Sequence, residues 1–299
     1  MTDLTRRNFL KLSGISTLTV AGATFLTGCG PASQSSDGSS SNDSSSTASS
    51  DTLGDGKTLR VGMEAAYAPY NWQAESASDT TIPIENVSGA YADGYDVQIA
   101  KKIAEALGME PVAVKMEFGA LVDSLVNGQI DIICAGMSTT PERAQSVDFT
   151  DSYIDDEVVI VVKQDSKYAS ATKLSDFDGA TVLGQKDTFY DDLIDEIPNV
   201  NHLTPVATVP LVVDGIENGT CDAITFSSMS LPNLLENYPD LKKIELADGE
   251  GFSDPGNPDN AAIAKGQDGM LSKLNEIIAG ISQSDRLSIW QDCMDRQPA

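Results

Sequence analysis

Apolar residues between positions 57 and 163 follow two spacings in turn. Short alternating or continuous runs of Val, Ile and Leu are typical of strands, whereas repeats at three and four residues are typical of helices. The first spacing predicts strands over 57–63, 111–117, 130–135 and 158–162, and the second predicts helices over 95–107 and 121–126. Tyr91-Ala92-Asp93-Gly94 is interpreted as a turn. Strands that alternate with helices indicate an α/β lobe with a largely parallel sheet.

The same alternation then begins again, with predicted strands over 180–183, 221–226 and 261–264 and predicted helices over 190–197, 212–218, 232–237, 270–281 and 287–294. Each half contains a helix that ends at Asn-Gly, one spacer, and an Asp that opens a strand. The two segments are Asn127-Gly128-Gln129-Ile130-Asp131 and Asn218-Gly219-Thr220-Cys221-Asp222. This weak internal echo predicts two similar α/β lobes.

The first 56 residues show neither spacing. Thr5-Arg6-Arg7-Asn8-Phe9-Leu10-Lys11 is a twin-arginine export pattern, and an apolar stretch follows over 12–26. It ends at Leu26-Thr27-Gly28-Cys29, which resembles a bacterial lipobox. We therefore expect a lipoprotein signal peptide over 1–28 and lipidation at Cys29; the alternative is an ordinary signal peptide with an unrelated Cys. The segment 29–56 is rich in Ser, Asp and Gly, which predicts a disordered tether.

Composition narrows the possible partners and chemistry. The 45 acidic and 19 basic residues give a net charge of −26, which disfavours nucleic acid as a partner. Cys134, Cys221 and Cys293 match no zinc spacing and are interpreted as buried thiols, with a Cys221–Cys293 disulfide as the alternative. We expect no metal and no cofactor. Asp254, Asp259 and Asn260 could host calcium, but a solvated turn is the preferred interpretation.

A candidate anion site follows the predicted strand over 130–135. In Ser138-Thr139-Thr140-Pro141-Glu142-Arg143, Thr140 is a suitable helix N-cap and Pro141 a suitable first helical residue. Arg143 then falls in the first turn, beside free backbone N–H groups. This combination suits a carboxylate bound by both arms of the guanidinium. The alternative is an Arg that bonds only to a nearby acid or to water.

Two segments resemble family 3 extracellular solute-binding proteins, which serve polar amino-acid ABC importers. They are Gly94-Tyr95-Asp96-Val97-Gln98-Ile99-Ala100 and the run from Gly128-Gln129-Ile130-Asp131 through Arg143 to Tyr153, and the resemblance extends over 59–297. It implies a two-lobed periplasmic-binding-protein fold of type II, with two crossing strands at a hinge. The implied crossings lie near 161–164 and 260–265, with lobe 1 formed by 57–162 and 262–299 and lobe 2 by 163–261.

The resemblance also implies roles for single residues. Arg143 would hold the ligand's α-carboxylate, with Ser138 and the backbone of Gly136 and Ser138 completing the cradle. Tyr67 and Phe118 would be apolar walls. Glu64 falls where some binders of basic amino acids carry an acid. Thr188 would reach the carboxylate from the other lobe.

Two positions depart from the family pattern. Asp187 stands where the family has Gly, and Ser227 stands where the family has the acid that holds the α-ammonium. A hydroxyl supplies no charge. Either another acid, with Asp187 first and Glu64 second, binds the ammonium, or the ligand has none.

The resulting expectation is a binding lipoprotein on the outer face of the cell membrane. It would be a monomer that hands a small solute, an amino acid by preference, to an ABC permease. Two alternatives stay open: a solute sensor without transport, and an enzyme resembling the cyclohexadienyl dehydratases on the same fold. The enzyme is disfavoured because the single histidine, His202, is predicted in a surface loop and no nucleophile–base pair is evident.

Overall fold

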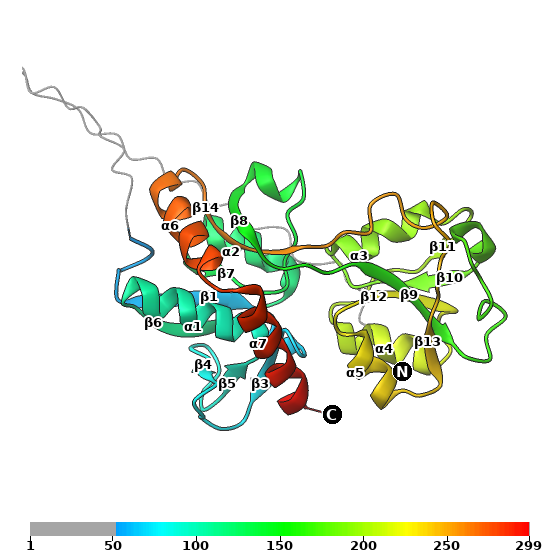
Figure 1. Ribbon diagram of the computed structural model, residues 1–299, viewed down its shortest axis with the longest axis horizontal. Helices are drawn as coiled ribbons and strands as arrows, with labels where there is room; N and C mark the ends of the chain where they lie inside the picture. Colours follow the sequence, from blue (N-terminus) through cyan, green and yellow to red (C-terminus); the bar gives the residue numbers. More distant parts are fainter. Residues whose placement is uncertain (1–51, 299) are drawn as a thin grey trace, which may run out of the picture. The chain divides into compact units, whose positions relative to one another are not determined.

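Lobe 1 is built on a five-stranded sheet of order β6-β1-β7-β14-β8 (Figure 1). The computed structural model describes residues 52–298, so the predicted signal peptide, Cys29 and all but the end of the predicted tether lie outside the described residues. β1 runs parallel to β6 and β7, whereas β14 is antiparallel to both β7 and β8. The sheet is therefore mixed rather than largely parallel. The strands are β1 (Thr58–Met63), β6 (Glu110–Lys115), β7 (Ile132–Ile133), β8 (Val147–Ile154) and β14 (Asp259–Ala264).

A second, four-stranded sheet of order β2-β3-β5-β4 adjoins lobe 1. Its antiparallel strands are β2 (Ala66–Tyr67), β3 (Asn71–Ala74), β4 (Ile82–Pro83) and β5 (Tyr91–Asp93). The turn prediction at Tyr91–Asp93 is wrong, because these residues pair with β3 as strand β5. A three-residue strand shows no periodicity, and its partner lies about twenty residues away, so the local pattern could not reveal it.

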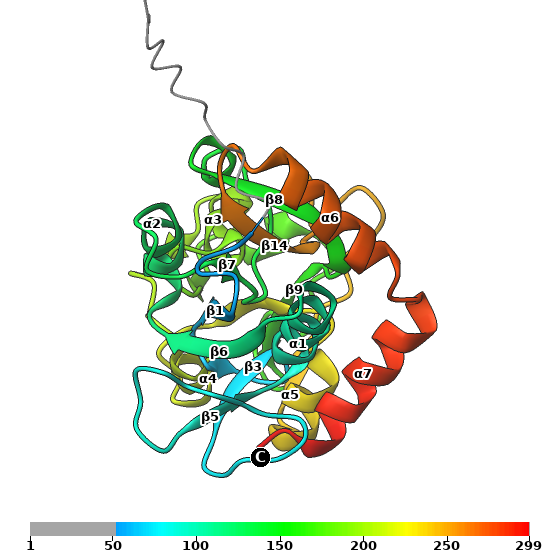
Figure 2. The same cartoon turned by 90° about the vertical axis from the view of Figure 1, so that its left-hand side faces the viewer.

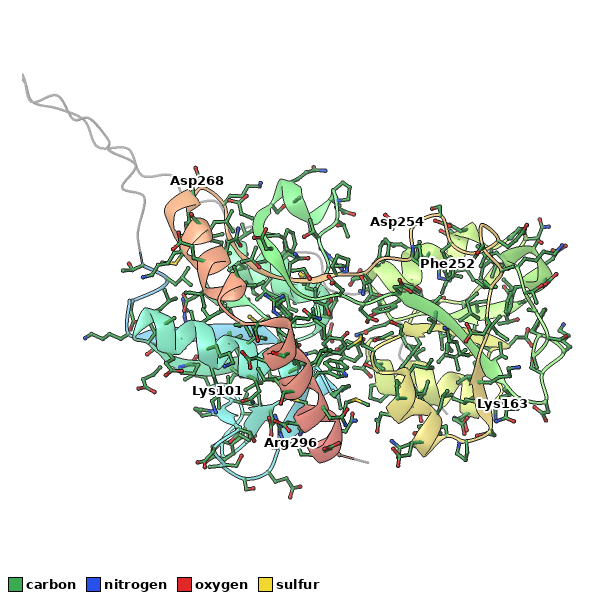
Figure 3. All side chains as sticks on the ribbon, viewed as in Figure 1. Lys101, Lys163, Phe252, Asp254, Asp268 and Arg296 are labelled. Carbon is green, nitrogen blue, oxygen red and sulfur yellow. The ribbon has the colours of Figure 1, made fainter. Side chains whose placement is uncertain are left out.

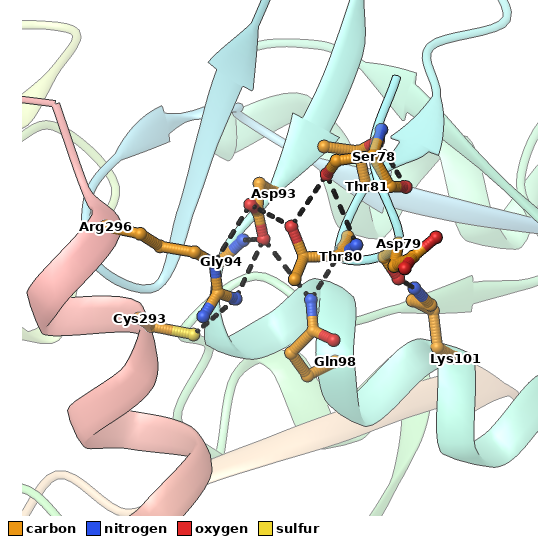
Figure 4. Close-up of polar contacts among 10 residues, drawn as sticks. All are labelled: Ser78, Asp79, Thr80, Thr81, Asp93, Gly94, Gln98, Lys101, Cys293 and Arg296. Carbon is orange, nitrogen blue, oxygen red and sulfur yellow. Dashed lines mark hydrogen bonds and ion pairs between the residues drawn. The ribbon is translucent and has the colours of Figure 1, made fainter. Parts of the chain in front are cut away.

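Lobe 1 is covered by the helices α1 (Tyr95–Leu107), α2 (Leu121–Val126), α6 (Asp268–Ala279) and α7 (Gln283–Arg296), with short 3₁₀ helices at Phe118–Ala120 and Arg143–Gln145. α1 has the predicted bounds and ends at Gly108, whose left-handed backbone suits glycine. α6 and α7 lie along one side of the lobe (Figure 2). Nε and Nη2 of Arg296 each donate to the Asp93 carboxylate at 3.0 Å, which fixes the end of α7 to β5 (Figure 4).

Lobe 2 is built on a sheet of order β11-β10-β12-β9-β13 (Figure 1). Alternate residues of β9 pack into two separate apolar clusters, so both faces of this central strand are buried. The strands are β9 (Val158–Lys163), β10 (Thr181–Leu183), β11 (Asn201–His202), β12 (Ala223–Ser227) and β13 (Leu241–Lys243). The helices are α3 (Phe189–Asp192), α4 (Val209–Glu217) and α5 (Leu231–Asn237), with 3₁₀ helices at Leu174–Phe177 and Leu193–Glu196.

The two crossings lie earlier in the chain than predicted. All of β9 belongs to the second sheet, and all of β14 belongs to the first. The chain therefore changes lobe between Ile154 and Val158 and returns before Asp259. The crossings run antiparallel and form a bridge between Glu157 and Gly256. A continuous apolar run such as β9 gives no sign of which sheet it joins, which explains the error.

The internal echo corresponds to the same local structure in both lobes. Asp131 accepts a bond from the backbone N–H of Arg60 on β1, and Asp222 accepts one from the backbone N–H of Thr181 on β10, each at 2.9 Å. The glycines of the two Asn-Gly turns have the same left-handed φ of 69°. In lobe 1 the Asp also binds a guanidinium, because Nε and Nη2 of Arg60 donate to the Asp131 carboxylate. Asp222 of lobe 2 has no such contact within residues 52–298.

Other predictions can be compared with residues 52–298. The predicted tether ran to position 56, but Leu53 is 2% exposed, so the folded part begins at the end of that segment. Cys134, Cys221 and Cys293 are buried free thiols, and the disulfide alternative is not formed. Within residues 52–298, none of the helices has the length and apolar character needed to cross a membrane.

Candidate functional site

Arg143 lies in a single 3₁₀ turn rather than at the start of a helix. The Thr140 hydroxyl accepts a bond from the Arg143 backbone N–H at 3.2 Å, as an N-cap would, but the helical segment comprises only Arg143–Gln145. The predicted helix is therefore wrong, and no helix dipole contributes to anion binding here. The Ser146 N–H bonds back to the Arg143 carbonyl and the chain then enters β8, which stops the helix. The guanidinium itself has to supply the positive charge.

The Arg143 guanidinium connects the lobes. Nη1 donates to the Ser138 carbonyl at 2.8 Å, and Nη2 donates to the Asp187 carbonyl of lobe 2 at 2.8 Å. The guanidinium also lies over the Phe118 ring, 5.3 Å from its centroid. Burial lowers the pKa of Arg143, while the neighbouring acids Asp192 and Asp187 oppose this shift. A half-buried guanidinium whose partners are neutral carbonyls retains an unneutralised charge, which suits an incoming carboxylate.

Six residues predicted for the site line one small cavity, which we call the Arg143 cavity. Its volume is about 10 Å³, room for roughly one water molecule. The six come from both lobes: Tyr67, Phe118, Gly136, Ser138, Arg143 and Thr188. The structure thus brings together residues that lie up to 121 positions apart, as the difference between positions 67 and 188 shows.

Gly136 allows the close approach of an aromatic wall. Its φ is +59°, and a Cβ added there would lie 3.1 Å from the Tyr67 ring. Tyr67 stacks on Tyr70 with ring centroids 4.6 Å apart, and its hydroxyl oxygen lies 3.2 Å from that of Tyr190 in lobe 2. Tyr67 is therefore both a wall of the cavity and a contact between the lobes.

Thr188 is held in place by two local bonds. Its hydroxyl donates to the Gln185 carbonyl at 2.7 Å and accepts from the Asp191 N–H at 3.3 Å, which caps α3. The side chain is buried and faces the Arg143 cavity. A ligand oxygen that binds this hydroxyl must compete with the Gln185 carbonyl.

Asp187 presents its backbone, not its carboxylate, to Arg143. The side chain is 50% exposed and pairs with Lys186 at 3.6 Å. Its φ is +62°, a conformation that glycine adopts most easily. The carboxylate lies against Gly119 of lobe 1, where an added Cβ would clash with it. The geometry does not favour the prediction that Asp187 holds an ammonium, because its charge is solvated and already paired.

Glu64 is buried but does not line the Arg143 cavity. Its Oε2 accepts a bond from Gln185 of lobe 2 at 3.1 Å, and Oε1 has no hydrogen-bond partner within residues 52–298. Burial raises the pKa of Glu64 to about 7, although the bond from Gln185 opposes the shift. Glu64 is 6% exposed and is therefore not a surface carboxylate, which was the alternative to a ligand contact.

Ser227 lies in a second small cavity, also of about 10 Å³, which it shares with Tyr67, Gln185 and Tyr190. Its hydroxyl donates to Asp156 Oδ2 at 2.5 Å. Asp156 lies on the first crossing, is 4% exposed and accepts bonds from six donors. Position 227 thus lacks an acid but touches one supplied by the crossing.

Sequence reasoning missed Asp156, Tyr190, Asn257 and Asp259. The solvated-turn interpretation of Asp259 is wrong: this residue opens β14 and is 1% exposed. Asn257 lines the Arg143 cavity and donates to the Tyr190 hydroxyl at 2.9 Å. Their position in the chain could have identified three of them. Polar residues in or next to a segment that crosses between two lobes lie beside the cleft of a hinged two-lobed fold, and this describes Asp156, Asn257 and Asp259.

Comparisons with known proteins agree with this architecture. The family model for bacterial extracellular solute-binding proteins, family 3, matches residues 59–292. A Campylobacter jejuni protein named "Probable histidine-binding protein" is 29% identical over 198 residues, which are 66% of this chain and 71% of that protein. The ABC transporter glutamine-binding protein of Bacillus subtilis is 28% identical over 72% of this chain and 78% of its own length.

A solved structure shows the same fold. The crystal structure of the substrate-binding protein of an amino acid ABC transporter is 28% identical and superposes with a TM-score of 0.67. The match covers 80% of this chain and all of that protein. It confirms the predicted two-lobed type II architecture.

Proposed function

Because the chain belongs to the bacterial extracellular solute-binding proteins of family 3, we propose that it binds an amino acid between its lobes for an ABC importer. Two relatives that match over most of their length are named for histidine and glutamine binding. The observation that carries the proposal is the Arg143 cavity, where one guanidinium and residues from both lobes converge.

The chemistry of the Arg143 cavity suits a carboxylate. Both arms of Arg143 now donate to backbone carbonyls, and a charged carboxylate is a stronger acceptor than either. Ser138 and Thr188 add hydroxyl donors, while Tyr67 and Phe118 supply apolar walls. Glu64 and Ser227 lie at the margin of the site. In this proposal the role of Asp187 is its carbonyl.

Ligand entry requires the lobes to separate. The Arg143 cavity has a volume of about 10 Å³, far smaller than any amino acid. Three hydrogen bonds near it join lobe 1 to lobe 2: Arg143 to the Asp187 carbonyl, Tyr67 to Tyr190, and Gln185 to Glu64. A ligand that touches both lobes replaces these contacts and stabilises closure. The crossings on either side of Glu157 and Gly256 are the natural hinge.

A catalytic role has little support from the described residues. The His202 ring bonds Asp195 at 2.8 Å and Asp191 at 2.9 Å, and this ring does not line the Arg143 cavity. Burial lowers the pKa of His202 and the two acids raise it overall, and both ring nitrogens are already engaged by these acids. The binding-protein function is therefore preferred over the dehydratase alternative.

Calorimetry with the twenty genetically encoded L-amino acids tests this proposal. At least one should bind the purified chain with a Kd in the micromolar range or below, and solution scattering should show a smaller radius of gyration at saturation. If none binds below about 1 mM, which corresponds to only about 4 kcal/mol, the proposed function is wrong.

Membrane attachment is a separate part of the proposal. The twin-arginine pattern and the lipobox ending at Cys29 support export followed by lipidation. Cys29→Ser expressed in a bacterial host that lipidates exported proteins should move the protein from the membrane fraction to the soluble fraction. The matched control is Cys134→Ser, a buried thiol of lobe 1 that should leave fractionation unchanged. Equal membrane retention of Cys29→Ser and the parent would contradict the anchor.

A further inference from the structure

Asp259 is an acid that no donor satisfies. Neither carboxylate oxygen has a hydrogen-bond partner within residues 52–298, and the residue is 1% exposed. The amide oxygen of Asn257, two positions earlier, is likewise buried without a partner. With the amide oxygen of Asn260, four buried acceptor atoms without a hydrogen-bond partner among residues 52–298 lie on the segment 257–260. A buried polar group without a partner is costly, so this arrangement calls for an explanation.

The Asn257 acceptor lies at the wall of the proposed ligand site, and Asp259 follows two positions further along the chain. Asn257 lines the Arg143 cavity, and side chains two positions apart on extended backbone face the same way. The Asp259 backbone forms a bridge with Ser138, which belongs to the same cavity. Burial raises the pKa of the Tyr67 and Tyr190 hydroxyls, and the nearby Asp259 charge adds to both shifts.

The nearest hydroxyls bond Asp156 rather than Asp259, although Tyr70 lies close enough to Asp259 to oppose the rise in its pKa that burial causes. Tyr70 donates to Asp156 at 2.9 Å and Tyr190 donates to Asp156 at 3.1 Å, so the first crossing takes up these donors. Asp156 is therefore saturated, whereas Asp259 retains all its acceptor capacity. Only a group with several donors and no acceptor would satisfy two carboxylate oxygens and an amide oxygen together, which describes an ammonium.

We propose that Asp259, with the amide oxygen of Asn257, binds the α-ammonium of the ligand and replaces the acid that is absent at position 227. The inference rests on the proposed function, because it assumes that Arg143 holds the carboxylate of the same ligand. It makes the ligand class an amino acid with a free α-ammonium and excludes the deaminated carboxylic acid. Asp187 and Glu64 are then not needed for this role.

The same assignment predicts proton release on binding. Burial raises the pKa of Asp259 well above its usual range, and the adjacent Asp156 raises it further. An ammonium bound beside this carboxyl favours the ionised form and so lowers the pKa of Asp259 again. Binding should release up to about one proton per ligand near neutral pH.

The experiment uses calorimetry at pH 7 in two buffers of different ionisation enthalpy. The probes are the twenty L-amino acids and, for each that binds, the carboxylic acid with hydrogen in place of the ammonium. The wild type should bind the amino acid at least about tenfold more tightly than its deaminated analogue and should release protons. Asp259→Asn should bind the amino acid at least about tenfold more weakly and release none.

Two controls make the result specific. Asp254→Asn removes an exposed acid from the same loop, at the position labelled in Figure 3, and should match the wild type. Asn257→Ala should weaken binding less than Asp259→Asn does, while still releasing protons. Asp259→Asn should fold at least as stably as the wild type, since it replaces a buried carboxyl that has no hydrogen-bond partner among residues 52–298 by a neutral amide of the same shape, and thermal unfolding will verify this.

The outcomes separate the two proposals. If no amino acid binds the wild type, the proposed function fails, and this inference fails with it. If an amino acid binds but Asp259→Asn binds it equally well, or the deaminated analogue binds as tightly, the proposed function stands and the Asp259 assignment is overturned.

Discussion

The two lobes share a sheet order and a turn, yet they differ in the kind of chemistry they bring to the cleft. Lobe 1 supplies the ionisable side chains: Arg143 lines the Arg143 cavity, and Glu64 and Asp259 are buried near it. Lobe 2 supplies neutral donors and acceptors at the same place, namely Thr188, Gln185, Tyr190 and Ser227. The repeat therefore provides the scaffold, and in the proposed function the recognition of a charged ligand depends on the side chains that lobe 1 adds to it.

The difference extends to the cores. Lobe 1 has one continuous apolar cluster, whereas the sheet of lobe 2 separates two smaller ones. Lobe 1 also gains α6 and α7 from the end of the chain. A larger core generally gives a larger share of stability, so we expect lobe 1 to hold its geometry while lobe 2 moves against it.

The largest expected effect compares the contributions of the two lobes to ligand affinity. Arg143→Ala should weaken binding by about 2–5 kcal/mol, because a ligand carboxylate loses its charged partner. Thr188→Ala should cost about 0.5–1.5 kcal/mol, the usual worth of a neutral hydrogen bond. Calorimetry with the tightest-binding amino acid measures both, and Arg143→Lys, which keeps the charge but not the two-armed geometry, should fall between them. Equal losses in both alanine variants would remove the distinction between the lobes.

The next effect compares the repeated acids through stability. Asp131→Asn should lower the free energy of unfolding by about 2–4 kcal/mol, because it leaves the Arg60 guanidinium beside a buried neutral group. Asp222→Asn should cost about 1 kcal/mol, because its partner is a backbone N–H. Urea unfolding gives both values. A larger loss in Asp222→Asn would show that the guanidinium does not strengthen the lobe 1 copy.

A third prediction concerns pH. The pKa of Glu64 is raised by burial to about 7, from an ordinary value of 4.5, so the folded state binds its proton more tightly than the unfolded state. Stability from this group is complete below about pH 4.5 and is lost as pH rises toward 7, with a slope of at most about 1.4 kcal/mol per pH unit. Glu64→Gln should match the wild type near pH 4 and exceed its stability by about 1–3 kcal/mol at pH 8.

Urea midpoints across that pH range provide the measurement for Glu64. Asp254→Asn, which alters an exposed acid, serves as the control for the change in net charge. Parallel pH profiles for Glu64→Gln and the wild type would mean that Glu64 titrates as an ordinary surface acid.

The smallest expected effect tests the repeat itself. Gly128 and Gly219 have the same φ of 69°, and an added Cβ would meet nothing within 4 Å at either position. Alanine at each site should therefore cost only its backbone strain, about 1 kcal/mol. Thermal unfolding should give the same loss for both variants to within about 0.5 kcal/mol. A clear difference would show that the two turns are not equivalent.

Where the chemistry is local, the sequence predicted the structure well. The spacing of apolar residues and the flanking Gly94 and Gly108 defined α1 to the residue. The segment from Ser138 to Arg143 predicts an anion cradle, because its hydroxyls and guanidinium lie within a few positions of each other. The structure brings Arg143 to the Ser138 carbonyl, and the role of the segment in binding stays a prediction. The Asn-Gly-X-X-Asp echo likewise depends only on a turn and the strand that follows it.

Where the structure depends on distant contacts, the sequence was less informative. The propensity of Thr140-Pro141 for a helix start was overridden, because β8 begins immediately after Ser146. Asp259 reads as part of a polar turn, and only pairing with Ser138 and β8 buries it. Tyr190 and Asp156 enter the site from elements more than thirty positions apart, so no spacing rule connects them.

The three contacts across the lobes mean that the protein competes with its own ligand. Arg143, Glu64 and Tyr67 each have a hydrogen-bond partner in the other lobe. The measured binding free energy is then the difference between the interactions that a solute makes and the contacts between the lobes that it replaces. A small molecule that makes only one good contact cannot replace all three hydrogen bonds between the lobes, so it binds weakly. The contacts between the lobes therefore contribute to specificity in addition to the contacts with the ligand.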